Sequence, residues 1–143
     1  MEITRTALVL HPARDMYQLV QDVGSYPDFL SWCTHARVLE QSAELQLARL
    51  DVSIGGLKQS FTTRNRLVPG ELLTLSLVDG PFRHLAGEWR FDSLTAQGSK
   101  VSLCLSFEFS SSLLSSAFRR GFARVADKLV LDFSRRADQV YGA

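Results

Sequence analysis

The segment that decides the fold lies near the C-terminus, where residues Leu113–Tyr141 read LLSSAFRRGFARVADKLVLDFSRRADQVY. Its apolar residues recur every three or four positions, which is the spacing of one face of an α-helix. They are Leu113, Leu114, Ala117, Phe118, Phe122, Val125, Ala126, Leu129, Val130, Phe133, Ala137, Val140 and Tyr141. No proline interrupts the pattern. A helix of this length would be about 40 Å long, enough to cross a sheet of about six or seven strands spaced about 4.8 Å apart.

The residues before this predicted helix alternate with a period of two. Apolar residues from Val101 to Phe109 occupy every second position, with Ser102, Cys104, Ser106 and Glu108 between them. Such alternation predicts a strand with one buried and one wet face. The same period extends back to Ala36, and the turns between strands fall at Gly55–Gly56, Pro69–Gly70, Asp79–Pro81 and Gln97–Gly98. Short turns between neighbouring strands favour an antiparallel sheet.

The N-terminal part adds one strand and two short helices. Residues 2–10 alternate as a strand does, and Pro12 then suits the first turn of a helix. An apolar face follows, ended by Gly24, and residues 25–30 restart a short helical turn. We therefore predict an α+β fold over residues 1–143. One domain would hold a curved antiparallel sheet of about seven strands around the long helix.

The alternation that predicts the strands is irregular within residues 36–54 and at Gly87. Within residues 36–54, Leu45 and Leu47 share one parity while Leu50 and the apolar residues after it share the other. This predicts a bulge or a register error. Gly87 lies inside a strand pattern, where a bulge or a bend is the favoured interpretation. The alternative is room for a bound molecule or for the crossing helix.

Composition excludes several classes of protein. The 143 residues are 45% hydrophobic and 22% charged with a net charge of +1, which gives no sign of a DNA-binding protein. Three separated histidines and two unpaired cysteines match no metal-ligand motif. No carboxylate pair suggests acid–base catalysis, so we expect no catalytic residues, no metal and no cofactor. With no apolar run of about 20 residues and no targeting pattern, we expect a cytoplasmic protein.

The segments that point to binding are the inward-facing polar and aromatic residues. Gln59, Thr63 and Asn65 share the buried parity of their strand, so they either bond each other and the helix or line a cavity. Residues 26–32, rich in aromatic side chains, would close an opening between sheet and helix, where an apolar pocket can form. The outer parity carries Arg64 and Arg66, which form either a solvated face or part of an RNA-binding patch.

Several segments together resemble a known family. They are Arg5–Val9, Met16–Val20, Ser25–Leu30 with Cys33, Phe61–Asn65, Leu77–Phe82, Trp89–Phe91, Phe107–Phe109 and Val140–Tyr141. In order and across the whole chain, they resemble the bacterial ribosome association toxins of the RatA type. These belong with the coenzyme-Q-binding START-domain proteins, often labelled polyketide cyclase/dehydrase. One departure is Ser31, where the family often has proline, and Trp32 follows it.

The resemblance implies a helix-grip fold, in which the sheet grips the C-terminal helix around an apolar cavity, with no defined catalytic residues. Our first hypothesis is therefore binding of a hydrophobic molecule, ubiquinone or a related polyprenyl lipid, in support of respiratory quinone function. Thr63 and Asn65 would meet the quinone oxygens. The expected cavity residues are Tyr26, Phe29, Leu30, Trp32, Phe61, Thr63, Asn65, Leu75, Leu77, Phe82, Leu85, Trp89, Phe118, Phe122, Val125 and Leu129.

The second hypothesis is a toxin of the RatA type that binds the large ribosomal subunit and blocks 70S subunit association. Its expected ribosome or RNA contacts are Arg64, Arg66, Arg119, Arg120 and Arg124. The family label also suggests a polyketide cyclase or aromatase, a weaker alternative because similar folds host unrelated functions. Under each of these hypotheses we expect no transmembrane segment, and peripheral contact with a membrane stays open.

Overall fold

The structure is a computed structural model that describes residues 1–111 and 114–142. Its elements are β1 (Glu2–Val9), α1 (Ala13–Gln21), the 3-10 helix η1 (Val23–Asp28), β2 (Cys33–Gln41), β3 (Leu45–Ile54), β4 (Leu57–Val68), β5 (Leu72–Asp79), β6 (Phe82–Thr95), β7 (Gly98–Phe109) and α2 (Ser116–Tyr141). This is the predicted order of one strand, two short helices, six strands and one long helix.

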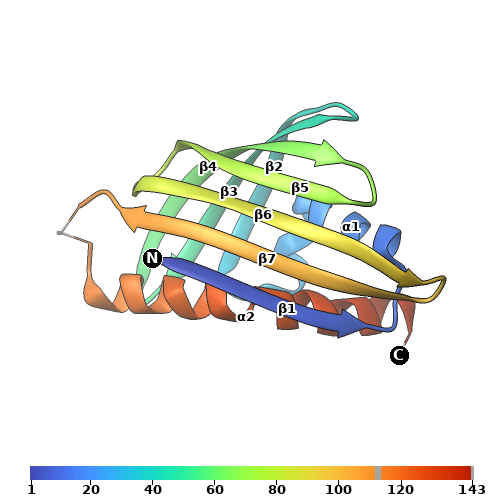
Figure 1. Cartoon of the computed structure of the whole chain (residues 1–143). Helices are drawn as coiled ribbons and strands as arrows, with labels where there is room; N and C mark the ends of the chain where they lie inside the picture. The colour runs from blue at the N-terminus through green and yellow to red at the C-terminus, as the bar shows by residue number, and fades with distance from the viewer. Residues whose placement is uncertain (112–113, 143) are drawn as a thin grey trace.

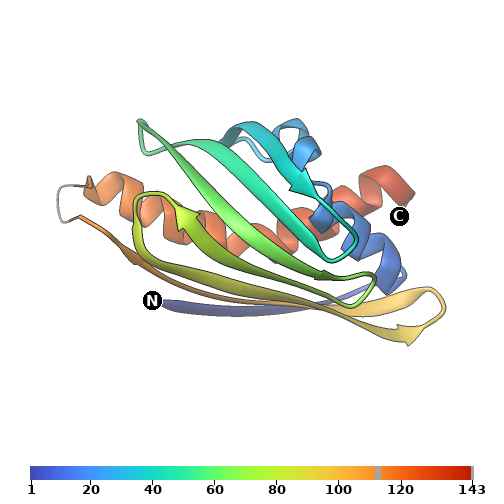
Figure 2. The same cartoon turned by 90° about the horizontal axis from the view of Figure 1, so that it is seen from above.

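The seven strands form one antiparallel sheet in the order β1-β7-β6-β5-β4-β3-β2. Strands β2 to β7 follow each other as a meander, and β1 pairs along the far side of β7. The sheet curves around α2, which runs the length of its inner face, with α1 and η1 covering one end (Figures 1 and 2). The α+β class and the predicted sheet around a long helix are confirmed.

Helix α2 begins later than the sequence pattern suggested. The helix spans Ser116–Tyr141, about 39 Å, and Leu114 precedes it, whereas Leu113 lies outside the described residues. Ser115 is the N-cap: its backbone is extended and its side-chain oxygen accepts the N–H of Phe118 at 3.1 Å. The apolar pattern continues past this cap, so periodicity alone placed the start too early.

The bulge predicted within residues 36–54 falls on a different strand from the one expected. Strand β3 pairs with β4 without interruption from Leu45 to Ile54. The register shifts instead lie in β2, at Cys33/His35 and Val38/Glu40. Leu45 and Leu47 are on the outer face of β3, whereas Gln46 and Ala48 are buried. The apolar pattern of β3 changes parity because Leu45 and Leu47 face outward and Gln46 faces inward, and not because the strand contains a bulge.

Gly87 makes room for its neighbours. It pairs with Leu75 on one side and Leu105 on the other, and no register shift occurs at this position. A Cβ atom added here would lie 2.8 Å from Cδ1 of Leu105 and 3.4 Å from Cγ of Leu75. A bulge, one of the two favoured interpretations, is thus wrong, and the space that a side chain would need is filled by two leucines.

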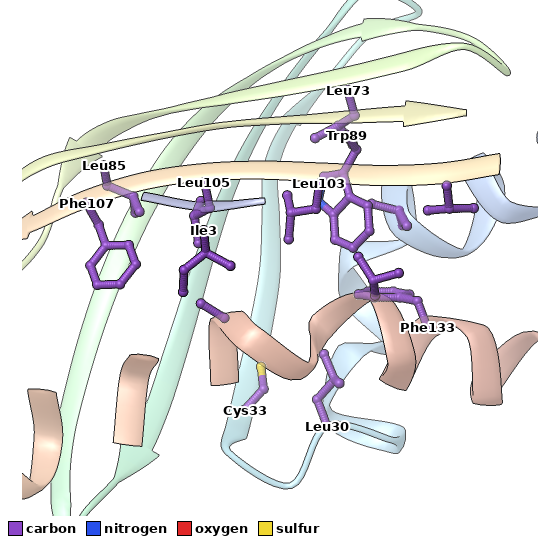
Figure 3. Packing of buried hydrophobic residues seen from close by; sticks show 14 of the residues in the cluster. Ile3, Leu30, Cys33, Leu73, Leu85, Trp89, Leu103, Leu105, Phe107 and Phe133 are labelled. Carbon is purple, nitrogen blue, oxygen red and sulfur yellow. The ribbon is translucent and has the colours of Figure 1, made fainter. Parts of the chain in front are cut away.

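The core lies between the sheet and α2. Helix residues Phe118, Phe122 and Phe133 are almost fully buried against the inner face of the strands. In Figure 3, Trp89 of β6 points down onto Phe133 of α2, and their ring centroids are 5.3 Å apart in an edge-to-face arrangement. Among the described residues, no helix is both long enough and apolar enough to span a membrane.

Candidate ligand pocket

An apolar pocket lies between the inner face of the sheet and the middle of α2. Its volume is about 90 Å³. Strands β3 to β7 provide one wall, α2 the opposite wall, and η1 with the loop after it closes one side. The lining residues are Tyr26, Trp32, Leu50, Phe61, Leu75, Leu85, Trp89, Leu105, Phe122, Val125, Ala126, Leu129 and Phe133.

Nine of the sixteen expected cavity residues are in this lining. They are Tyr26, Trp32, Phe61, Leu75, Leu85, Trp89, Phe122, Val125 and Leu129. Phe29, Leu30, Leu77, Phe82 and Phe118 instead pack elsewhere in or around the core. The sequence argument omitted Leu50, Leu105, Ala126 and Phe133, all of which have the apolar periodicity of their elements. Which of these residues reach the pocket depends on where α2 crosses the strands.

Thr63 and Asn65 are inward-facing, as their parity indicated, but they are outside the pocket lining. Thr63 Oγ1 donates to Asn65 Oδ1 at 2.9 Å, and Asn65 Nδ2 donates to Gln46 Oε1 at 2.8 Å. Gln46 Nε2 then donates to the backbone carbonyl of Gln21 at 2.8 Å and to Gln41 Oε1 at 2.9 Å. Thr63 and Asn65 therefore bond each other, as one alternative held, but the network continues through Gln46 to the end of α1 and not to the long helix.

The pocket lining offers little chemistry for catalysis. The described lining residues carry no carboxyl, imidazole or amino group. The Tyr26 hydroxyl donates to the carbonyl oxygen of Val20, and removal from water raises the pKa of that phenol. Cys33 is buried nearby, its thiol donating to the carbonyl of His35 at 3.4 Å, and burial raises the pKa of the thiol to about 11. A thiol so buried stays protonated and unreactive at neutral pH.

The five arginines expected at a ribosome contact occupy two separate surfaces. Arg64 and Arg66 are exposed on the outer face of β4, whereas Arg120 and Arg124 are exposed on α2, which covers the inner face. Arg119 is half-buried and is bonded to two backbone carbonyls. Its guanidinium donates to the carbonyls of Ser111 at 2.6 Å and Leu114 at 3.2 Å.

The outer face of the sheet carries two further arginines that the sequence argument missed. Arg37 on β2 and Arg49 on β3 are direct cross-strand partners, and β4 next to them carries Arg64 and Arg66. We call these four residues the outer arginine surface. Arg49 is held by Asp51 at 3.3 Å and by Ser60 at 3.2 Å. Arg49 has the same parity as the outward-facing Leu45 and Leu47. Assigning these two leucines to the outer face would therefore have placed Arg49 on that face as well.

Comparison with known proteins identifies the family. The sequence pattern described as "Polyketide cyclase / dehydrase and lipid transport" matches residues 9–134, which is most of the chain, from the end of β1 to the last third of α2. The chain belongs to this family. The family description names both an enzyme activity and lipid transport. Membership of the family therefore does not decide between the two, and the residues of the site have to.

The most informative relatives carry different names. The ribosome association toxin RatA of Escherichia coli K12 is 44% identical over 142 residues, covering 99% of this chain and 90% of that protein. The coenzyme Q-binding protein COQ10 homolog B of Xenopus laevis is 30% identical over 131 residues, covering 89% of this chain and 54% of that protein. The Zhui aromatase/cyclase of Streptomyces sp. R1128 matches in structure with a TM-score of 0.82 at 23% identity, covering 100% and 98% of the two chains. That last likeness shows the START-like helix-grip fold alone.

Proposed function

We propose that this chain, a cytoplasmic protein acting as a single domain over residues 1–143, binds a hydrophobic molecule of the ubiquinone type in the pocket under α2. The observation that carries the proposal is the pocket itself, whose lining is apolar on both walls. An apolar cleft with few polar groups is the usual form of a small-molecule site. The coenzyme Q-binding relative, 30% identical, supports a quinone as the class of ligand.

The pocket volume defines how much of such a ligand can enter. About 90 Å³ is well below the roughly 300–1,000 Å³ typical of sites for drug-sized ligands. The ligand therefore inserts its compact ring end, and the half-buried lining residues Leu50 and Leu129 move aside to admit it. A long isoprenoid tail would extend past these residues to the surface.

Two measurements test ligand binding. Mass spectrometry of an organic extract of the purified protein should detect a quinone or another polyprenyl lipid in near-stoichiometric amount. Both tryptophans of the chain, Trp32 and Trp89, line the pocket, so intrinsic fluorescence reports on it directly. Added quinone should quench this fluorescence with saturation. An empty extract together with unsaturable quenching would argue against the proposal.

A second candidate function is association with the large ribosomal subunit, preventing formation of the 70S ribosome. The RatA relative at 44% identity and the outer arginine surface favour it. Arg37, Arg49, Arg64 and Arg66 extend over three adjacent strands, and such a face can follow the phosphates of folded RNA. Binding would then weaken steeply with salt because phosphate contacts release counterions.

Charge reversal separates the two arginine surfaces. We compare R64E/R66E on the outer face with R120E/R124E on α2, a matched pair of changes at exposed positions. In sedimentation with large subunits at low and moderate salt, R64E/R66E should lose binding and R120E/R124E should retain most of it. Retained binding by R64E/R66E would exclude the outer surface, and absence of wild-type binding at low salt would exclude the function.

A further inference from the structure

The indole N–H of Trp32 is a buried donor with no acceptor. Among the residues that the structure describes, Trp32 Nε1 is the one buried side-chain nitrogen or oxygen without a hydrogen-bond partner. An indole nitrogen can donate but cannot accept, so it cannot pair with another donor. Buried polar groups nearly always have a partner, and leaving one unpaired is costly. The exception therefore requires an explanation.

The location of Trp32 suggests what the missing partner is. Trp32 lines the apolar pocket, and the other described lining residues have hydrocarbon side chains apart from Trp89 and Tyr26. The Tyr26 hydroxyl already donates to the carbonyl of Val20. Trp32 therefore lines a space in which no described side chain accepts a hydrogen bond from its indole N–H.

The backbone around Trp32 holds the indole in position. The carbonyl of Trp32 accepts the N–H of Ser53 in β3 at 2.9 Å, and the next residue, Cys33, donates its N–H to Leu30 at 3.0 Å. Cys33 is itself buried and begins β2. The loop between η1 and β2 is therefore tied on both sides to ordered structure, so the side chain at its end is presented in a defined place.

We propose that Trp32 Nε1 is the hydrogen-bond donor to the ligand, and that the ligand class is an apolar ring bearing a carbonyl or quinone oxygen. This inference rests on the proposed ligand binding and adds the group that selects the ligand. Thr63 and Asn65, already bonded to each other and to Gln46, do not take this role. A carbonyl oxygen accepts the indole proton without bringing a proton of its own, whereas an alcohol or amine also brings a donor that needs a partner, so the site favours the oxidised, carbonyl form of a ring.

Matched probes test the hydrogen bond separately from the shape of the pocket. Tetramethyl-1,4-benzoquinone and 1,2,4,5-tetramethylbenzene share a ring and four methyl groups and differ in two carbonyl oxygens. Their dissociation constants are measured by titration calorimetry on the wild type, on W32F and on W89F as the matched control. W32F should lower the affinity for the quinone relative to the hydrocarbon by roughly 3- to 10-fold, the worth of one hydrogen bond. W89F should leave that ratio unchanged.

The indole proton gives a second readout that a change in pocket size would not mimic. The chain has two tryptophans, so its nitrogen–proton correlation spectrum has two indole signals, which W89F assigns. Bound quinone should move the Trp32 indole proton downfield, and the hydrocarbon should not. An equal affinity ratio in the wild type and W32F, with no downfield shift, would overturn the inference while leaving ligand binding intact. Failure of both probes to bind the wild type would instead contradict the proposed function.

Discussion

Asn65 and Gln46 face each other across strands β4 and β3, and Nδ2 of Asn65 donates to Oε1 of Gln46 at 2.8 Å. Both side chains are almost completely buried. Their bond continues to Thr63 on one side and to the carbonyl of Gln21, at the end of α1, on the other. This chain of hydrogen bonds attaches α1 to the sheet, and it gives these polar residues a structural role.

Removing Asn65 from this network should destabilise the fold. N65A leaves the buried amide oxygen of Gln46 and the hydroxyl of Thr63 without their partner, at about 1–3 kcal/mol for each group. We expect a loss of about 2–4 kcal/mol in the free energy of unfolding, measured by urea denaturation. The control is R64A on the exposed face of the same strand, expected within about 0.5 kcal/mol of wild type. Equal effects of the two changes would contradict the structural role.

Gly121 lets α2 approach the sheet. A Cβ at this position would overlap Cγ2 of Ile54, the last residue of β3. G121A should therefore destabilise the protein by about 1–3 kcal/mol through overpacking, despite the better helix propensity of alanine.

The double variant I54A/G121A tests whether the contact with Ile54 causes the destabilisation by G121A. In an I54A background, where Cγ2 is absent, G121A should become neutral or stabilising by up to about 1 kcal/mol. The four free energies come from denaturant unfolding at one pH. An identical loss in both backgrounds would show that Ile54 is not what excludes a side chain at Gly121.

Stability should fall at alkaline pH because of two buried groups. Burial raises the pKa of the Cys33 thiol from 9.0 to about 11, and it also raises the pKa of the Tyr26 phenol above 10.0. The unfolded chain releases these protons first, so the stability that the Cys33 thiol contributes is complete below about pH 9 and is lost as the pH rises through about 11, while that of the Tyr26 phenol begins to fall above about pH 10. The urea midpoint should decline over that window, and less so in C33A. A midpoint independent of pH up to 10.5 would refute the assignment.

The long helix and the last strand could be predicted because the apolar residues of each repeat at one constant spacing without interruption. Val101–Phe109 alternates without exception, and the apolar face of α2 continues from its first turn to Tyr141. The start of α2 could not be read in this way, because Ser115 caps the helix while the apolar pattern continues upstream. Parity failed in β3 for a related reason: its outward leucines resemble core residues, and its inward Gln46 resembles a surface residue.

The pocket was harder to predict than the fold. The sequence indicates which residues of α2 are apolar, but the crossing position of the helix decides that Ala126 and Phe133 reach the pocket while Phe118 does not. Likewise, Thr63 and Asn65 have the correct parity for a cavity, and only the identity of their neighbour Gln46 shows that they are already bonded. Long-range partners of this kind leave no periodic signal in the sequence.

The central claim, that a hydrophobic ligand occupies the pocket under α2, is tested most directly by filling that pocket. Ala126 lies on the helix wall and is almost completely buried, so A126L places additional carbon atoms into a space of about 90 Å³. We measure ubiquinone binding by equilibrium titration, with circular dichroism and the urea midpoint to verify folding. The wild type should bind one quinone per chain, and folded A126L should bind at least about tenfold more weakly, a loss of about 1.4 kcal/mol. Equal binding by the two proteins would show that the ligand lies elsewhere.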